Sequence, residues 1–447
     1  MNWRSLAHMA ISFVVGLAIA VGMTSASPVN ISICGQLHYC KPIVDGFAPV
    51  PPPPPPPPSD TNAGLRPGQF KSQGRTHYYQ LPAGEAKGTL VVLPGCARWG
   101  PGFWPYDAKG CTTCAGLTED VAHTKQALAR GYAIFVPWPI DRSYPGQYCW
   151  GAKDDGPTLP KIISEFLAQN KLSSKPVFAM GASSGGSVAL KLQALLESAQ
   201  VPFKLSGVIA LVSTNLDVKD YAPRQKHSPP TAWITLSYPN EIKQGQANVA
   251  AYKKYAPSGF AMSDVKPVVP TYFSDRHPQI TPVQSAEIVA GLKSIKLLGP
   301  DGIFLVDLKK NKGWAPKLYA AVPWLKKSPV YALGPTKKSA IQQAMLVAQA
   351  GHEHVCDYLT AALMWLESGG KGNFEDLAKK YRVVKPSKLT MARYGSEPMP
   401  AEAFAPRTAG GAGGRLLIEN VVPVETPDVL TTLTTADNYA TYAPYEL

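Results

Sequence analysis

The segment Pro176–Gly186, PVFAMGASSGG, joins a short apolar run to a turn of small residues. The run Pro176–Gly181 predicts a buried strand, and the apolar pattern of Ser184–Ser198 predicts a helix directly after the turn. A G-x-S-x-G pentapeptide between a strand and a helix is typical of a nucleophile elbow, a tight turn that exposes a serine at the end of a sheet. Ser183 is therefore the candidate nucleophile. The alternative is a turn that binds phosphate or has no ligand.

Further strands and helices alternate on both sides of this elbow. The predicted strands are Gly88–Gly95, Tyr132–Pro137, Pro176–Gly181, Val208–Val212 and Thr231–Ser237, and the predicted helices are Glu119–Arg130, Leu159–Gln169, Ser184–Ser198, Ala340–Gln349 and Asp357–Glu367. Apolar strands separated by helices indicate a mostly parallel sheet with helices on both faces. The sequence therefore predicts one α/β domain over residues 65–370.

The composition excludes two broad classes of protein. The chain has 447 residues and is 45% hydrophobic, which is enough for a large core and excludes full disorder. Its one long apolar run, Ile11–Met23, is too short to span a bilayer comfortably, so a polytopic membrane protein is excluded as well. We expect no stable membrane span in the mature chain.

The formal net charge of +13 is concentrated in residues 65–370, because the segments before and after are each neutral. Lys293–Lys338 holds ten lysines against two aspartates, a net charge of +8, and no arginine. Surfaces that bind nucleic acid usually mix arginine and aromatic residues with lysine, so we do not expect that partner. A lysine-rich solvated face is the simplest interpretation. An anionic substrate or an acidic wall polysaccharide is the functional alternative.

The N-terminus has the pattern of a secretory signal over residues 1–26. Arg4 precedes the apolar run, and Thr24-Ser25-Ala26 is a small-residue cleavage site. A single membrane anchor is the alternative, but no basic cluster follows the run. The mature protein is thus expected outside the cell or in the cell wall. Asn30 begins the single glycosylation sequon.

The chain contains seven cysteines, and a secreted chain should join most of them in disulfides. The candidates are Cys34, Cys40, Cys96, Cys111, Cys114 and Cys149. Cys34 and Cys40 would close a small loop of their own, whereas the other four flank the expected mouth of the sheet. A zinc site formed by these four is the less favoured alternative.

The remaining segments differ in composition from the domain. Residues 27–64 combine two cysteines with a polyproline run, Pro51–Pro58, which predicts a stiff spacer. Residues 371–447 read as a flexible tail with one short helix at Phe374–Tyr381. Residues 242–338 are longer than one strand-helix-strand step requires. They form either a cap, which would bring the lysine-rich stretch near the substrate, or a decorated edge of the sheet.

A general base is expected from a histidine that follows the last strand, C-terminal to the nucleophile. The loop before the final helix holds His352 and His354. We favour His352, which comes earlier in the loop, and keep His354 as the alternative base. A metal site made of these two histidines and Cys356 lacks a fourth ligand, so no metal and no cofactor are expected.

The acid that orients the base should lie between Ser183 and His352 along the chain. Glu241 follows the predicted strand Thr231–Ser237 directly and is favoured, with Asp217 and Asp275 as alternatives. Its other interpretation is a carboxylate that favours a helix N-terminus.

Two backbone N–H groups are candidates for an oxyanion hole, which stabilises charge that develops on a carbonyl oxygen. Ser184 begins the helix after the elbow, and Cys96 follows the first strong strand. Pro94 has no N–H, and Gly95 allows close backbone approach. An ordinary Pro-Gly turn is the alternative.

The motifs occur in an order that resembles the α/β-hydrolase superfamily, and within it a little-characterised plant, algal and oomycete secreted group. They are Pro94-Gly95-Cys96, Phe103-Trp104-Pro105, Cys111-x-x-Cys114-x-Gly116-Leu117, Ala127–Tyr132, Asp141-Arg142, Cys149-Trp150, the elbow Gly181–Gly186 and His352-Glu353. The resemblance implies an α/β-hydrolase fold with Ser183 and His352 in the catalytic roles. It implies that Glu241 replaces the more usual Asp, and the chain departs from many hydrolases at Pro94, where they have His.

These observations predict a secreted serine hydrolase, favouring a carboxylic ester hydrolase with an acyl-enzyme intermediate. The substrate would be a small or polymer-linked ester, with an anionic one as a specific hypothesis. Two alternatives remain, namely a non-catalytic wall or surface-binding protein on a hydrolase fold, and a secreted serine peptidase.

Overall fold

The computed structural model describes residues 62–98, 100–140, 148–214, 216–237, 239–311, 313–333, 339–391 and 403. The predicted signal sequence, the Asn30 sequon, Cys34, Cys40, the polyproline run and most of the predicted tail lie outside the described residues.

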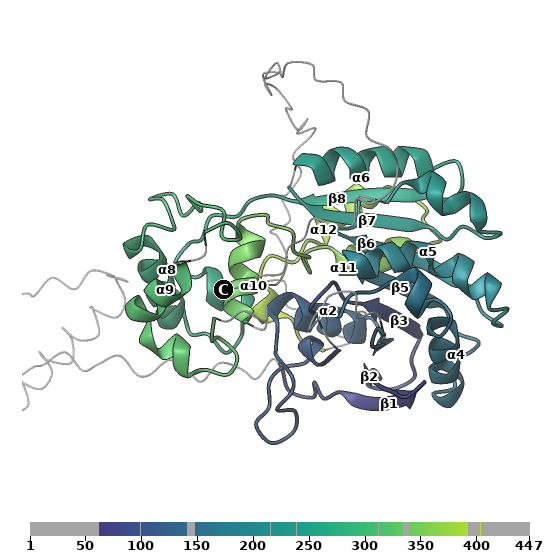
Figure 1. Ribbon diagram of the computed structural model, residues 1–447, viewed down its shortest axis with the longest axis horizontal. Coiled ribbons are helices and arrows are strands. Elements are labelled where there is room, and N and C mark those ends of the chain that lie inside the picture. The colour runs from purple at the N-terminus through teal and green to yellow at the C-terminus, as the bar shows by residue number, and fades with distance from the viewer. Residues whose placement is uncertain are drawn as a thin grey trace, which may run out of the picture. The chain divides into compact units, whose positions relative to one another are not determined.

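An eight-stranded sheet in the order β1-β2-β4-β3-β5-β6-β7-β8 organises the described domain (Figure 1). The strands are β1 (Gly68–Ser72), β2 (Arg75–Gln80), β3 (Gly88–Leu93), β4 (Tyr132–Val136), β5 (Val177–Ala182), β6 (Leu205–Leu211), β7 (Thr231–Leu236) and β8 (Ser258–Ser263). Strand β2 pairs antiparallel with β1 and β4, and the other pairs are parallel. Strands β3, β4, β5 and β7 are buried at every residue, as expected of a parallel sheet covered on both faces.

Helices pack on both faces of the sheet, and alternate residues of β3 show which ones. Leu90 and Val92 belong to the apolar cluster that contains α2 (Thr118–Ala129), α11 (Leu359–Glu367) and α12 (Phe374–Lys380). Val91 and Leu93 belong to the opposite cluster, with residues of α4 (Leu159–Gln169), α5 (Ser184–Ser198) and α6 (Pro239–Tyr252). The predicted α/β fold class, a mostly parallel sheet with helices on both faces, is confirmed.

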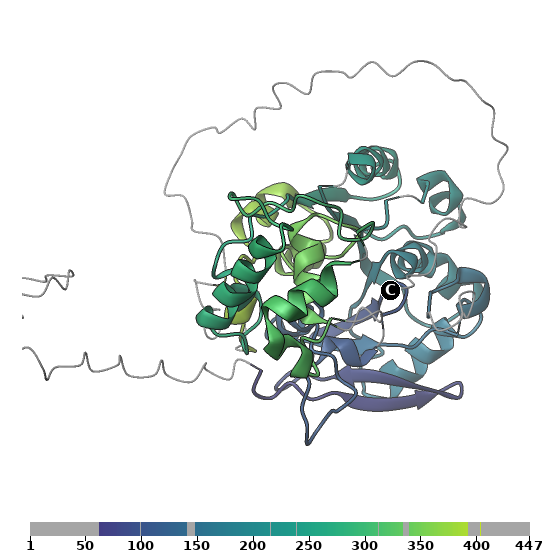
Figure 2. The ribbon, with the colours of Figure 1, turned by 60° about the vertical axis from the view of Figure 1, so that its left-hand side comes forward.

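The segment expected to form a cap divides into two parts after β8. Its beginning is α6 and β8, which belong to the main fold. The following residues form α7 (Tyr272–Arg276), α8 (Pro282–Ser294) and α9 (Trp314–Ala321), which pack with α10 (Ala340–Ala348) around an apolar cluster of their own. These green helices group together beside the sheet in both ribbon views (Figures 1 and 2). We call residues 264–333 the helical insertion.

The folded domain extends beyond residue 370, where the sequence analysis placed the start of a flexible tail. Helix α12 corresponds to the predicted short helix, and its Phe374 is buried against the face of β8, where it fills the space a side chain at Gly259 would need. Val383 and Leu389 are buried as well. Residues 371–391 therefore belong to the domain, because their apolar side chains complete its core.

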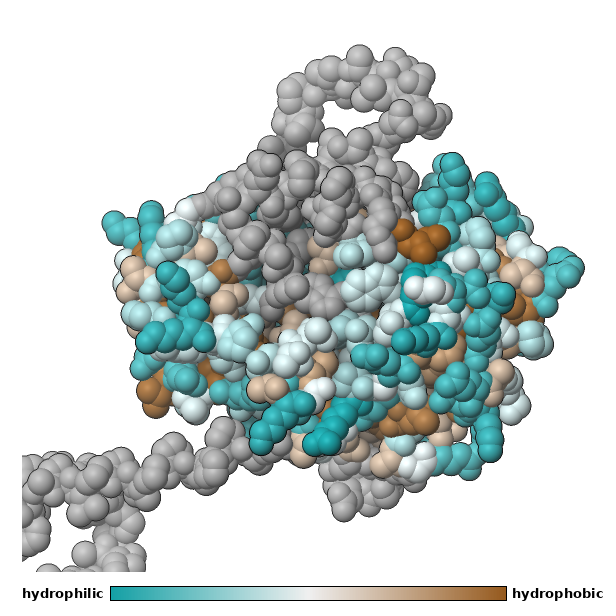
Figure 3. Space-filling view, turned by 60° about the horizontal axis from the view of Figure 1, so that its bottom comes forward, coloured by the Kyte–Doolittle hydropathy of each residue, from teal (hydrophilic) through white to brown (hydrophobic). Residues whose placement is uncertain are grey.

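The surface carries only scattered apolar side chains on the face drawn in Figure 3, where brown patches are small and separated by hydrophilic residues. The large hydrophobic residues that are exposed in the described part of the chain are Leu81, Val265, Val269, Val283 and Leu305. Among the described residues, every helix is too short or too polar to cross a membrane.

Candidate active site

Ser183 lies in the turn between β5 and α5, in a backbone conformation that is rare outside glycine. Its φ is 51° and its ψ is −118°. Such strain persists only where the surroundings fix it. The Ser183 N–H donates to the Leu211 carbonyl at 3.0 Å, and the Ser213 hydroxyl donates to the Ser183 carbonyl. The turn thus has the conformation expected of a nucleophile elbow.

Close backbone contacts explain why the elbow is rich in glycine. A Cβ atom on Gly185 would lie 2.0 Å from the Leu93 carbonyl oxygen at the end of β3, and one on Gly181 would lie 2.2 Å from the Gly185 oxygen. Both distances are well below any contact that a real Cβ atom makes. Helix α5 therefore begins directly against the ends of β3 and β5, which fixes the position of Ser183.

His352 lies between Ser183 and Glu241. The loop that follows α10 carries it, and its Nε2 atom is 3.0 Å from the Ser183 Oγ. Its Nδ1 atom is 2.7 Å from Glu241 Oε1. The side chains of His352 and Glu241 are 27% and 15% exposed, so this group of three is open to solvent on one side.

Glu241 is the third residue of α6 and lies in its first turn, soon after the end of β7. Both interpretations of Glu241 therefore agree with its position, because this carboxylate lies at a helix N-terminus and also contacts His352. Its second oxygen accepts a hydrogen bond from Thr235 at the end of β7, which holds the side chain toward the sheet edge.

The two alternative acids lie elsewhere and pair with other cations. Asp217 caps a short helical turn through the Lys219 N–H and pairs with the Lys219 ammonium at 3.0 Å. Asp275 lies 3.5 Å from Lys385. The described structure therefore brings Glu241, rather than either aspartate, to His352.

The predicted oxyanion donors lie beside the elbow. Ser184 is the first residue of α5, so its N–H belongs to the first turn, which has no partner within the helix. Its hydroxyl accepts a hydrogen bond from the Trp150 N–H and lies 3.3 Å from the Cys96 sulfur. A Cβ atom on Gly95 would be 3.4 Å from the Ser183 Cβ, so the loop that carries Cys96 borders the nucleophile.

The described part of the chain contains two disulfides, one of which borders this site. Cys96 is joined to Cys149, and Cys111 to Cys114, so these four predicted disulfide cysteines are confirmed. The first bond links the loop after β3 to the loop after β4. Cys356 is a free and buried thiol.

His354, the alternative base, contacts two carboxylates and makes none of the hydrogen bonds described for Ser183. Its side chain is 4% exposed, its Nε2 atom is 3.1 Å from Asp120 Oδ1, and its Nδ1 atom is 3.2 Å from Glu353 Oε1. Burial would lower the pKa of His354, but the charge and the hydrogen bond of Asp120 outweigh it and raise that pKa. His354 is therefore a buried imidazole between two carboxylates, with a raised pKa that favours its protonated form.

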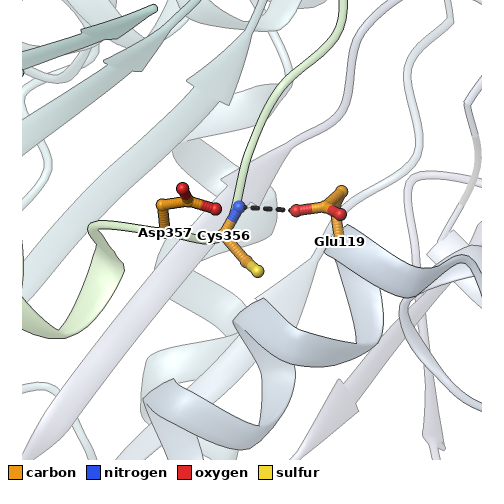
Figure 4. Close-up of side chains that lie close together, drawn as sticks. All are labelled: Glu119, Cys356 and Asp357. Carbon is orange, nitrogen blue, oxygen red and sulfur yellow. Dashed lines mark hydrogen bonds between the residues drawn. The ribbon is translucent and has the colours of Figure 1, made fainter. Parts of the chain in front are cut away.

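Glu119, Cys356 and Asp357 place three ligand-type atoms within 4.8 Å of one another in the interior (Figure 4). Arg276 donates to Glu119 at 2.9 Å, while Lys266 and Arg382 donate to Asp357 at 2.7 and 3.2 Å.

Burial raises the pKa of the Cys356 thiol well above its ordinary value, whereas a metal-binding cysteine is a thiolate. The donor set therefore fits a buried ionic network better than a metal site. The metal site considered from sequence is not assembled either, because His352, His354 and Cys356 each contact a different carboxylate.

Sequence analysis did not identify Arg98, Asp120 or Lys309 as part of this region. Arg98 pairs with Glu353 in the interior, and Asp120 pairs with His354. The Lys309 ammonium donates to the His352 carbonyl oxygen at 3.5 Å. Their residue types offered no signal, because each contact joins segments that are far apart in the chain.

Comparisons with known proteins give distant structural likeness and no sequence match. No protein-family model and no curated protein matches the chain. An esterase/lipase from an uncultured bacterium is 12% identical with a TM-score of 0.33, covering 46% of this chain and 75% of its own.

Two other structures are similar to the same degree. A hormone-sensitive lipase from a metagenome library is 10% identical with a TM-score of 0.33, covering 46% of this chain and 76% of its own. The Pyrobaculum calidifontis esterase is 12% identical with a TM-score of 0.32, covering 52% and 85%. The comparisons assign neither a family nor a substrate to this chain.

Proposed function

We propose that this protein is a secreted serine hydrolase that cleaves carboxylic esters through an acyl-enzyme intermediate. The observation that carries the proposal is the position of His352, whose ring lies 3.0 Å from the Ser183 hydroxyl and 2.7 Å from the Glu241 carboxylate. A nucleophile bonded to a base, and a base bonded to an acid, is the arrangement that activates serine.

The reaction would proceed in two stages. Ser183 Oγ attacks the ester carbonyl while His352 Nε2 accepts its proton, and Glu241 stabilises the imidazolium through Nδ1–H. The N–H groups of Ser184 and Cys96 stabilise the negative charge on the carbonyl oxygen. His352 then protonates the leaving alcohol. Water, deprotonated by the same histidine, releases the acid and restores Ser183.

The strained elbow favours this function over a protein that only binds. A binding surface has no need of a serine in a left-handed backbone conformation or of the hydrogen bond to His352. Preference for esters over amides rests on analogy with the fold class. The experiment described below therefore also measures peptide hydrolysis and polysaccharide binding.

Lys309 supports an anionic substrate. It belongs to the lysine-rich stretch of the helical insertion, and its ammonium lies at the carbonyl of His352. Burial lowers the pKa of Lys309, because solvent is partly excluded from the ammonium. The charges of Glu353, Asp307 and Glu241 act against this lowering. A cation so close to the base would favour an ester that carries an acidic group.

The location outside the cell rests on the predicted signal sequence and on the two disulfides, which persist in oxidising compartments. Detection of the processed chain in the culture medium, with mass-spectrometric mapping of both disulfides, tests it. A chain that retains residues 1–26 inside the cell would contradict it.

The decisive experiment is labelling of the mature protein with a fluorophosphonate, followed by a panel of neutral esters, acidic esters and peptides. Labelling at Ser183, lost in Ser183→Ala, is expected, together with ester turnover. An unlabelled protein that binds acidic polysaccharide equally well as wild type and Ser183→Ala would replace the hydrolase by a binding function. Turnover of peptides alone would replace the esterase by a peptidase.

A further inference from the structure

Four charged side chains of alternating sign form a buried row beneath the loop that carries His352. Arg98 donates to Glu353, the His354 ring lies 3.2 Å from Glu353, and the opposite ring nitrogen lies 3.1 Å from Asp120. All four side chains are at most 6% exposed. The Gln343 side chain also donates to Asp120, at 2.9 Å.

The row joins segments that carry different parts of the proposed site. Arg98 lies two residues after Cys96, in the loop that borders the nucleophile, and Glu353 directly follows His352. Asp120 lies in the first turn of α2, where the helix dipole favours a carboxylate. The Arg98–Glu353 contact is therefore a direct link between the predicted oxyanion loop and the base loop.

The surroundings favour the charged forms of Asp120 and His354. Burial would raise the pKa of Asp120, but His354, Arg98 and Gln343 outweigh it and lower that pKa to about 2. The pKa of His354 is raised by Asp120 and Glu353. His123, whose ring is 5.6 Å from His354, has its pKa lowered to about 4 by burial and by the His354 charge.

Stability alone does not account for such a row. Removing charges from water costs several kcal/mol per ion, and apolar residues of similar volume often stabilise a fold as well or better. What a buried ion pair supplies is a fixed distance and orientation between its partners. Here the ion pair joins two loops. Their relative position determines whether the Cys96 N–H can stabilise the oxyanion while His352 accepts the proton of Ser183.

We propose that Arg98 and Glu353 are positioning residues, which hold the loop of Cys96 and the loop of His352 in the register that catalysis requires. The inference rests on the proposed hydrolase function. A displacement of about 1 Å can cost roughly 100-fold in rate, so loss of this pair should reduce kcat more than substrate binding. We expect Glu353→Gln and Arg98→Met each to lower kcat by about 10- to 100-fold, with KM changed less than about threefold.

A double variant separates positioning from stability. Each single variant removes one member of the ion pair and leaves the other charge buried with less compensation, so both should be destabilised, whereas Arg98→Met/Glu353→Gln removes both charges. We expect the double variant to recover stability to urea while kcat stays at least about tenfold below wild type. Recovery of kcat together with stability would show a structural role only and overturn the proposal.

Arg130 and Glu367 provide the matched control. They form another arginine-carboxylate ion pair, with distances of 3.0 Å and below, at the opposite end of α2 from Asp120. Arg130→Met/Glu367→Gln should leave kcat and KM within about twofold of wild type in the correctly folded fraction. A fall in kcat equal to that of the Arg98/Glu353 double variant would also overturn the proposal, because the effect would then not depend on position.

The readouts keep this inference distinct from the proposed function. Absence of fluorophosphonate labelling in wild type contradicts the hydrolase itself. Labelling and turnover in wild type, with unchanged kcat in Arg98→Met and Glu353→Gln, contradict only the positioning role. Active-site titration with the fluorophosphonate supplies the concentration of folded enzyme, so that kcat is not confused with partial unfolding.

Discussion

His352 and His354 stand two residues apart in one loop, yet their surroundings give them opposite chemistry. His352 is 27% exposed and lies between a neutral hydroxyl and one carboxylate. His354 is 4% exposed and lies between two carboxylates. Both ring nitrogens of His354 face carboxylates, which raise its pKa, whereas Nε2 of His352 faces the Ser183 hydroxyl. The partners of each imidazole, rather than its place in the sequence, therefore distinguish the proposed base from its neighbour.

The largest expected effect is at His352. His352→Gln removes the proton acceptor of Ser183, and loss of a base in such a group of three costs at least about 10³-fold in kcat. The free energy of unfolding should change by less than about 1 kcal/mol, because the His352 side chain is partly exposed to solvent. Ester turnover and urea unfolding of the same preparation test both statements, and a variant that keeps more than a tenth of wild-type kcat would contradict the assignment.

The same substitution at His354 should act on stability first. His354→Gln leaves Asp120 and Glu353 buried with less compensating charge, which is expected to cost about 3–5 kcal/mol. Urea unfolding measures the loss, with His352→Gln as the matched control from the same loop. Equal stability of the two variants would mean that His354 is not the charged partner of the row.

The pH dependence of stability sharpens the contrast. Because the pKa of folded His354 is raised above 6.5, its contribution is complete below pH 6.5 and declines as the pH rises through the folded pKa. Asp120 has the opposite sign, since its contribution is present above pH 3.8 and is lost as the pH falls toward 2. The stability difference between wild type and His354→Gln should shrink both above neutral pH and in acid. A difference that is constant from pH 3 to 9 would contradict the charged row.

The sheet and the turn that carries Ser183 could be predicted from sequence because their signals are local. Apolar runs identified β3 to β7, and G-x-S-x-G identified the elbow. Strands β1, β2 and β8, which lie at the edges of the sheet or next to one, were missed for a physical reason. Strand β2 has one buried residue in six, and β8 alternates between buried and partly exposed residues, so neither has the continuous apolar run of a central strand.

The choice between the two histidines depended on long-range contacts that no local pattern encodes. His354 meets Asp120 across 234 positions of sequence, and Arg98 meets Glu353 across 255. Helix α2 is buried at every residue, including Glu119 and Asp120, because α10, α11 and the helical insertion pack against it. From sequence alone, the charged first turn of α2 predicts an exposed position, because the segments that cover it are distant along the chain.

The smallest expected effect concerns Lys309, which contacts the backbone of His352. If this cation recruits anionic esters, Lys309→Met should lower kcat/KM for an acidic ester by about fivefold, the size expected of a partly solvated ion pair. Neutral esters should change less than twofold, and the salt dependence of the acidic ester should weaken, because salt screens the attraction. Lys310→Met is the matched control, since the neighbouring side chain is 88% exposed. Equal losses for neutral and acidic esters would show that Lys309 supports the His352 loop instead of selecting substrate. Its role would then be structural, like that of His354.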